Sequence, residues 1–149
     1  MKKAITILTI CLLAFAGMQN AQAQTKEETI EWIKEKLEKY YKGDIDEITV
    51  EPCLIKWKHY SSRADDVYWT YSFNPSLGGN WSSYENSGGT PGYWVKAEAS
   101  IIKVYYSYHN SYSDSKAFII SDGEPHLAER MAKALNHLAT FCEKKKEAF

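Results

Sequence analysis

The sequence has little cysteine, little proline and little net charge. Three cysteines and four prolines occur in 149 residues, and the formal net charge is −1. No Cys-x-x-Cys pair and no histidine pair at i, i+4 supplies the ligand spacing of a zinc site. The small net charge argues against binding to nucleic acid through bulk positive charge. With 44% hydrophobic and 25% charged residues, the composition is that of a globular protein.

Residues 1–23 predict a cleaved export signal. Lys2 and Lys3 form a basic start, residues 4–17 are apolar, and Ala21-Gln22-Ala23 is a small-x-small cleavage site. The apolar stretch is shorter than the ~20 residues that a membrane-spanning helix needs. We therefore expect cleavage near Ala23 and export to the periplasm, the cell surface or the medium. A retained amphipathic helix is the alternative, and no membrane span is expected after cleavage.

Residues 24–149 are then expected to form a single domain, since this length suits one hydrophobic core. Loss of Lys2 and Lys3 takes the net charge from −1 to −3. Thr25 and Glu28 match a capping box at the start of a helix over residues 25–42. Apolar residues recur there at helical spacing, and Gly43 is expected to end the helix.

A second amphipathic helix is predicted after residue 121. Ser121 or Asp122 is expected to cap it, with Pro125 at the first helical position. The apolar residues advance by 4, 4, 3 and 4 and form one buried stripe: Leu127, Met131, Leu135, Leu138 and Cys142. Lys144 to Lys146 are interpreted as a solvated helix end.

Between the helices, residues 46–121 show the period-two pattern of antiparallel strands. One strand has Cys53, Ile55, Trp57 and His59 on a single face, and a polar turn then leads into a second strand, which predicts a hairpin. Residues 74–92 read as a glycine-rich loop with one short strand within residues 77–84. Residues 110–115 are expected to be a polar turn, and residues 116–121 a closing strand.

The alternation changes phase between residues 93 and 108. Odd-numbered residues are apolar up to Ile101, and even-numbered residues are apolar from Ile102 onward. A one-residue shift turns every side chain to the other face of a sheet. A bulge near residues 100–102 or a tight turn would resolve the conflict. Because no glycine, proline or asparagine marks a turn, we expect one long, bulged and bent strand.

The predicted architecture is α+β: an N-terminal helix, a bent antiparallel sheet of about five to seven strands, and a C-terminal helix. The closing strand Phe118-Ile119-Ile120, followed by a helix containing Lys133-Ala134-Leu135-Asn136-His137-Leu138, resembles small exported bacterial proteins of unknown function with a pleckstrin-homology-like (PH-like) fold. The helix start Thr25-Lys26-Glu27-Glu28 is also similar to that group. The resemblance implies a fold and supplies no function.

Well-studied pleckstrin-homology domains bind inositol phosphates through basic residues near their first hairpin. The comparable residues here are Lys56, Lys58 and Arg63. The charges of Asp65 and Asp66 offset their attraction for phosphate, so binding of this kind is not expected.

The two cysteines that remain after signal cleavage predict a disulfide. Cys53 begins the alternation that faces the core, and Cys142 ends the apolar stripe of the C-terminal helix. An exported protein meets an oxidising compartment. The alternative is two separate buried thiols. The apolar periodicity predicts which way each cysteine points, but it does not predict how far apart the two cysteines lie.

No catalytic residue, metal ligand or cofactor is predicted. The chain has neither a Gly-x-Ser-x-Gly elbow nor a His-Glu-x-x-His helix. His126 and His137 lie eleven residues apart, roughly 16 Å along a helix and too far to share a metal. We interpret both as part of a polar outer face. His59 is interpreted as a core or rim histidine whose hydrogen bonds are satisfied, and not as a catalytic base.

Aromatic residues carry the functional prediction. Most alternate along strands and fill the core, but Trp81, Tyr84, Tyr93 and Trp94 lie in or beside the glycine-rich loop. We expect Trp81 and Trp94 to be partly exposed near one another. Rings also occur on both faces of the sheet, since Tyr105 alternates with Tyr106.

The function predicted from this pattern is an exported, non-catalytic binding module for a protein, peptide or glycan, with no nucleic-acid partner. A small secreted hydrolase or enzyme inhibitor is the alternative. A pocket joining a histidine to a carboxylate would favour the enzyme, and an aromatic surface would favour binding. The oligomeric state stays open.

Overall fold

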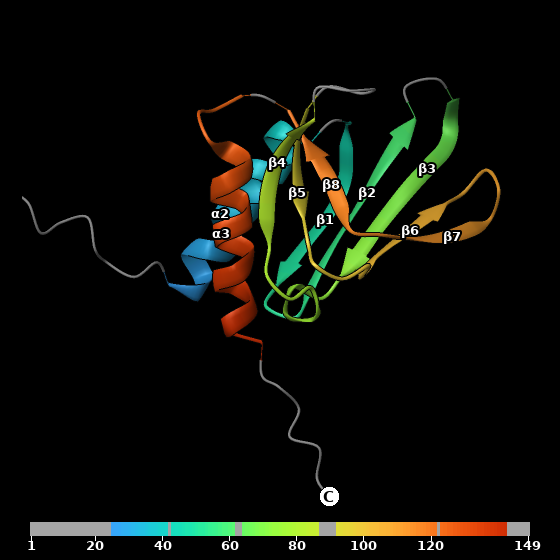
Figure 1. Ribbon diagram of the computed structural model, residues 1–149. Helices are drawn as coiled ribbons and strands as arrows, with labels where there is room; N and C mark the ends of the chain where they lie inside the picture. Colours follow the sequence, from blue (N-terminus) through green and yellow to red (C-terminus); the bar gives the residue numbers. More distant parts are fainter. Residues whose placement is uncertain (1–24, 42, 62–63, 87–91, 122, 143–149) are drawn as a thin grey trace, which may run out of the picture.

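The computed structural model describes residues 25–41, 43–61, 64–86, 92–121 and 123–142. The predicted signal peptide, residues 87–91 of the glycine-rich loop, and Lys144 to Lys146 lie outside the described residues. The described residues form two α-helices, one short 3-10 helix and eight strands in two antiparallel sheets (Figure 1). Among them, no helix combines the length and apolar character needed to cross a bilayer.

The first helix, α2 (Lys26–Tyr40), begins with the predicted capping box. The Glu28 amide donates to Thr25 Oγ1 at 3.2 Å, and the Thr25 amide donates to Glu28 Oε2 at 2.8 Å. Ile33 and Leu37 are buried on the face that packs into the core. The prediction that Gly43 ends the helix is wrong, because the helix ends at Tyr40 and Tyr41 already adopts an extended conformation. The Tyr41 amide makes the last helical hydrogen bond, to the Leu37 carbonyl.

The larger sheet has the strand order β1 (Ile45–Glu51), β2 (Leu54–Ser61), β3 (Ala64–Phe73), β6 (Ile102–Tyr106) and β7 (Ser111–Ser115). The predicted hairpin is confirmed: β2 and β3 pair antiparallel, with Trp57 opposite Tyr71. The prediction of a turn over residues 110–115 is wrong, because these residues include β7. The turn lies just before it and ends at Asn110, whose positive φ of 47° an asparagine tolerates.

The smaller sheet has the order β4 (Ser82–Asn86), β5 (Gly92–Lys96) and β8 (Ala117–Ile120). The short strand predicted within residues 77–84 corresponds to β4, which begins at Ser82 and extends to Asn86. It follows the 3-10 helix η1 (Pro75–Leu77). The predicted closing strand is confirmed as β8, which pairs with β5 so that Val95 lies opposite Phe118.

The phase change is where the chain passes from one sheet to the other. In β5 the odd-numbered Val95 is buried, whereas in β6 the even-numbered Ile102 is buried. The two strands belong to different sheets, so the prediction of one long, bulged strand is wrong. The crossing segment is held by backbone bonds from Glu98 and Ala99 to the Gly78 carbonyl. Because the two strands lie in different sheets, odd-numbered residues of β5 and even-numbered residues of β6 can both point into the shared core.

The core lies between the two sheets and the helices. Trp57 of the larger sheet packs edge-on against Phe118 of the smaller sheet, with ring centroids 5.4 Å apart. The second helix, α3 (Leu127–Thr140), contacts β4, β5, η1 and α2. Its predicted stripe is buried at Leu127, Met131, Leu135 and Leu138. The overall class is therefore α+β, with two antiparallel sheets in place of one bent sheet and eight strands in place of five to seven.

The start of α3 differs from the prediction. His126 occupies the N-cap position with a positive φ of 57° and makes no capping hydrogen bond through its side chain. Ser121 and Pro125 both precede the helix, and Asp122 lies outside the described residues. Backbone bonds take the place of a side-chain cap: the Leu127 amide donates to the Glu124 carbonyl at 3.2 Å.

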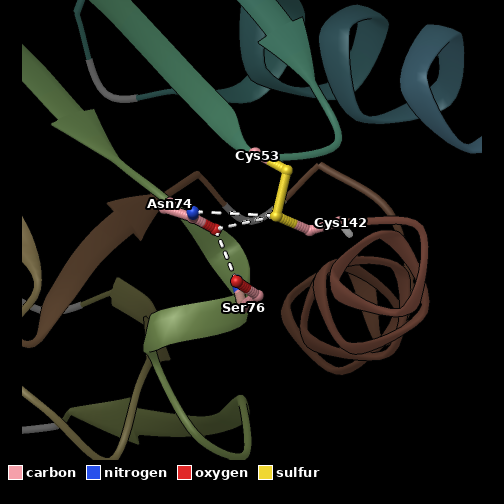
Figure 2. Close-up of a disulfide and its surroundings, with 4 residues drawn as sticks. All are labelled: Cys53, Asn74, Ser76 and Cys142. Carbon is pink, nitrogen blue, oxygen red and sulfur yellow. Dashed lines mark hydrogen bonds between the residues drawn. A yellow bond between two sulfur atoms is a disulfide. The ribbon is translucent and has the colours of Figure 1, made fainter. Parts of the chain in front are cut away.

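The predicted disulfide between Cys53 and Cys142 is confirmed, with Cα atoms 5.1 Å apart (Figure 2). Cys53 does not face the core, however. It is exposed in the turn between β1 and β2, one residue before the alternation of β2 begins. Asn74 lies beside the bond, and its Nδ2 is 3.7 Å from Cys142 Sγ. The bond links the first hairpin turn to the residues that follow α3.

Candidate functional site

Trp81 is a core residue, and the prediction that it is exposed is wrong. Only 2% of its surface is accessible. Its indole packs against Phe73 and Phe118, and Nε1 donates to the Pro75 carbonyl at 3.0 Å. A side chain at Gly78 would come within 3.0 Å of this indole, so the adjoining glycine makes room for it. The glycine-rich surroundings thus allow close packing of Trp81, although they were interpreted as a sign of exposure.

The other three predicted binding residues lie on two different faces of the smaller sheet. Tyr84 and Trp94 are stacked on the face turned away from the core, with centroids 6.0 Å apart and ring planes within 9°. Tyr84 is exposed and Trp94 is half-buried. Tyr93 points to the other face and lines a cavity of about 400 Å³ beside Glu124 and His126. The structure therefore brings together Tyr84 and Trp94 only.

A larger aromatic surface lies on the larger sheet. We call it the tyrosine row, and it consists of Tyr60, Tyr68, Tyr105 and Tyr112. Each of β2, β3, β6 and β7 contributes one member, and neighbouring ring centroids are 5.9, 5.9 and 4.9 Å apart. The row faces away from the core because the alternate residues of β2 and β3 point inward. Its two ends are exposed, Tyr60 at 36% and Tyr112 at 75%.

Polar groups are fixed around the row. Lys58 Nζ lies 4.6 Å from the ring centroids of both Tyr60 and Tyr68. It also donates to the Tyr60 hydroxyl at 2.7 Å, and this hydrogen bond raises the pKa of Lys58. The Tyr105 hydroxyl donates to Asn110 Oδ1 at 3.1 Å, and desolvation raises the pKa of Tyr105. The row thus presents aromatic rings, hydroxyl groups and a lysine held over two aromatic faces.

Sequence reasoning missed the row for an identifiable reason. Tyr60 and Tyr68 flank the predicted hairpin turn on one face, and Tyr105 was placed on the face opposite Tyr106. The sequence predicts a turn over residues 110–115, however, and therefore gives Tyr112 no sheet face. Only the pairing of β6 with β7, which sets Tyr105 opposite Tyr112, completes the row.

A cavity of about 620 Å³ lies where the end of α2 meets β1, β2 and β3. His59 lines it and stacks on Trp69 at 5.0 Å, and Trp69 in turn stacks on Tyr106 at 4.8 Å. Burial lowers the pKa of His59, and both of its ring nitrogens are buried without a hydrogen-bond partner. The prediction that His59 lies at the core or its rim is confirmed, but the expectation that its ring nitrogens are satisfied by hydrogen bonds is wrong.

The same cavity is lined by the carboxylates of Glu38 and Asp44. Because neither His59 nitrogen has a partner, no histidine–carboxylate hydrogen bond forms there within the described chain. General base catalysis by histidine requires such a nitrogen to reach its substrate or an orienting group. The cavity offers stacked rings to a ligand and has no assembled proton-transfer pair.

The remaining histidines have separate environments. His126 is exposed, as predicted, and lies 3.8 Å from a Glu129 carboxylate oxygen. His137 does not belong to a polar outer face, because it is half-buried and its Nδ1 lies 3.1 Å from Thr29 Oγ1 on α2. Among the residues with described positions, no group of three or more histidine, cysteine or acidic side chains is arranged to hold a metal ion.

No protein-family model matches the chain, and neither the curated proteins nor the solved structures include a significant match. The tyrosine row, the Tyr84–Trp94 pair and the His59 cavity are therefore the features on which a functional conclusion rests.

Proposed function

We propose that this protein is an exported, non-catalytic binding module that holds a protein partner on the tyrosine row. One observation carries the proposal. Four tyrosines from four adjacent strands stand side by side on the sheet face opposite the core, and both ends of the row are exposed. Tyrosine combines a large apolar ring with a hydrogen-bonding hydroxyl, and it is enriched at recognition surfaces for that reason.

The geometry of the row favours a protein over a glycan. Its neighbouring rings are inclined to one another by 66°, 50° and 45°, so they do not form one flat platform for a sugar chain. Residues 102–115, which form β6, β7 and their turn, contain four tyrosines and four serines. Antibody loops use this pairing, in which tyrosine supplies rigid contact area and serine supplies adaptable hydrogen bonds.

Export is part of the same proposal. The disulfide between Cys53 and Cys142 suits an oxidising compartment, which supports the export signal expected over residues 1–23. We also propose that the protein has a PH-like fold. The direct passage from strand β8 into helix α3, which packs against the smaller sheet and η1, supports it.

Site-specific photocrosslinking tests the binding surface. A photoreactive benzoylphenylalanine replaces Tyr112 or Tyr60 in cells that produce the protein naturally, and replaces Leu77 in the control. Leu77 is a matched position because it is 65% exposed and lies on η1, away from the row. We expect a covalent adduct with one protein from both row positions and none from Leu77.

Mass spectrometry then identifies the adduct. Equal labelling from Leu77, or no adduct from either row position, would contradict the proposed surface. An adduct with a glycan would retain the surface and overturn the assignment of the partner as a protein.

A further inference from the structure

The two sheets have four edge strands: β1 and β7 in the larger sheet, and β4 and β8 in the smaller sheet. Helix α2 packs against β1, and α3 packs against β4. The edge of β8 is met by the end of α2, where Tyr41 forms a bridge with Ile120 and the Ser121 amide donates to the Tyr40 carbonyl. Strand β7 ends the larger sheet, and β6 is its hydrogen-bonded neighbour. An edge strand has a row of backbone donors and acceptors without sheet partners on its free side.

The two edges of the larger sheet differ in how they are protected. Strand β1 has a register shift between Ile45 and Glu47 and carries three acidic residues, which are devices that discourage further strand pairing. Strand β7 has the sequence Ser-Tyr-Ser-Asp-Ser, without proline or lysine. Its pairing with β6 is regular over five residue pairs, and its first four residues are exposed.

We propose that β7 accepts an extended segment of the partner protein as a sixth strand of the larger sheet. This inference rests on the proposed function, because the added strand would lie beside the exposed end of the tyrosine row. In this mode of recognition, main-chain hydrogen bonds supply affinity and alternate side chains supply specificity.

The surroundings of β7 indicate which side chains the segment carries. A shallow hollow of about 610 Å³ is lined by Lys103, Tyr112, Ser113 and Asp114. Asp114 is already paired with Lys103, at 2.7 and 2.9 Å, so the hollow has no unbalanced charge. On the other face of β7 the side chains are the small serines. The segment that fits has a large apolar side chain opposite Tyr112 and small side chains at the alternate positions.

The length of β7 favours a flexible segment over a second folded copy of the chain. Five residues span about 17 Å at ~3.4 Å per residue. Stable interfaces between folded chains bury roughly 800 Å² on each partner, more than a pair of five-residue strands covers. An extended segment forms its backbone bonds along the edge and places side chains in the hollow without a large rigid contact.

A designed peptide pair tests the mode of binding. The probe is acetyl-Lys-Ser-Val-Ser-Phe-Ser-Val-Ser-Lys-amide, which alternates small and large side chains. The matched control carries N-methyl groups on its five central backbone nitrogens and keeps every side chain. Binding is followed by NMR shifts and hydrogen exchange of the backbone amides of β7, with β1 as the internal control edge.

We expect the probe to slow exchange at alternate amides of β7 at least tenfold and to leave β1 unchanged, and the N-methylated peptide to do neither. No change at β7, or equal protection by the N-methylated peptide, overturns strand addition. In the absence of peptide, the β7 amides could become more protected from exchange as the protein concentration rises, together with a doubling of the molecular mass. That result would show that a second copy of the chain, and not a partner segment, pairs with β7.

A protein variant separates this inference from the proposed function. Asp114→Pro places a ring on the free edge, because the Asp114 amide lies on the side of β7 away from β6, and it leaves the tyrosines in place. We expect it to weaken probe binding at least tenfold. Far-ultraviolet circular dichroism checks its fold, and the N-methylated peptide remains decisive if the variant misfolds. A protein adduct from Tyr112 without probe protection of β7 would reject strand addition alone. Failure of both experiments would reject the binding surface as well.

Discussion

The side chain of Asn136 on α3 makes two hydrogen bonds to the backbone of Trp81. Its Oδ1 accepts from the Trp81 amide at 2.8 Å, and its Nδ2 donates to the Trp81 carbonyl at 2.9 Å. A side-chain amide can satisfy a backbone donor and acceptor together, as a neighbouring strand would. The segment between η1 and β4 is thereby tied to the helix, which holds the Trp81 indole in the core.

Asn136→Ala is expected to lower the free energy of unfolding by about 1–3 kcal/mol, because a part-buried backbone donor and acceptor lose their partners. Urea unfolding followed by circular dichroism measures the loss. Lys133→Ala, on the exposed face of the same helix, serves as the control and should change stability by less than about 0.5 kcal/mol. Equal effects of the two variants would show that the Asn136 bonds contribute nothing beyond the helix itself.

Trp81→Ala is expected to destabilise the protein by about 3–5 kcal/mol, as large cavities in cores do. Trp94→Ala removes a ring of the same size from the outer face of the smaller sheet, where it is half-buried, and should cost clearly less. Urea unfolding of both variants gives the comparison. A larger loss for Trp94 than for Trp81 would mean that the burial of the two rings is assigned the wrong way round.

Replacing both cysteines, as Cys53→Ser with Cys142→Ser, is expected to lower stability by about 4–5 kcal/mol in the chain-entropy description of disulfides. The cysteines are 89 residues apart, so the bond closes a long loop and restricts the unfolded chain strongly. Urea unfolding of the double variant and the oxidised protein provides the test. An unchanged unfolding midpoint would contradict the bond, as would two free thiols in the unfolded, unreduced protein.

Ionised Glu124 stabilises the folded protein, and this contribution is lost in acid when the carboxylate is protonated. Hydrogen bonds from Lys36 and Tyr40, with a further one from Arg130, lower the pKa of Glu124 to about 2. Its folded pKa lies below the ordinary value of 4.5. The stabilising effect is therefore complete above pH 4.5 and is lost as the pH falls from there through about 2.

Glu124→Gln should be less stable than the natural protein at pH 7, and the gap should narrow as the pH falls through this window. Thermal unfolding between pH 2 and 7 measures both proteins. Glu38→Gln is the control, because Glu38 forms an exposed pair with Lys34 at 4.0 Å, and such a pair contributes little to stability. A gap that stays constant across the window would show that Glu124 acts through packing and not through its charge.

Tyr112→Ser is expected to fold with a stability within about 0.5 kcal/mol of the natural protein, because surface positions away from buried networks tolerate substitution. Tyr112 is 75% exposed, so its ring contributes little to the core. Urea unfolding measures this directly. A much larger loss of stability would assign Tyr112 a structural role and would weaken its place in the binding surface.

The sequence predicted those elements whose patterns are local. The capping box at Thr25, the hairpin around Trp57 and the stripe on α3 each depend on neighbours within a few residues. The pairing of Cys53 with Cys142 was also predictable, although the predicted position of Cys53 on the core face was wrong. Cys53 lies in a turn and not on the core face, and the turn still places it beside the end of α3.

The features that the sequence did not reveal depend on partners distant in the chain. Trp81 is buried because Asn136 binds its backbone from another element, and nothing in the surrounding glycines and serines indicates that contact. The phase change at Ile102 was visible, but one strand with a bulge and two strands in different sheets give the same alternation. The polar composition of β7 concealed a strand whose regularity comes from its pairing with β6.

The position of the disulfide has a mechanical consequence. The strands from β2 to β8 and the helix α3 all lie within the loop that it closes, while α2 and β1 lie outside. Tension applied between residue 25 and residue 142 would pass along α2 and β1 and then across the sulfur–sulfur bond, so the pairing of β1 with β2 is the sheet contact that it loads. Under such a pull only the segment before Cys53 can lengthen, because the disulfide closes residues 53 to 142 into a loop that contains the tyrosine row and β7.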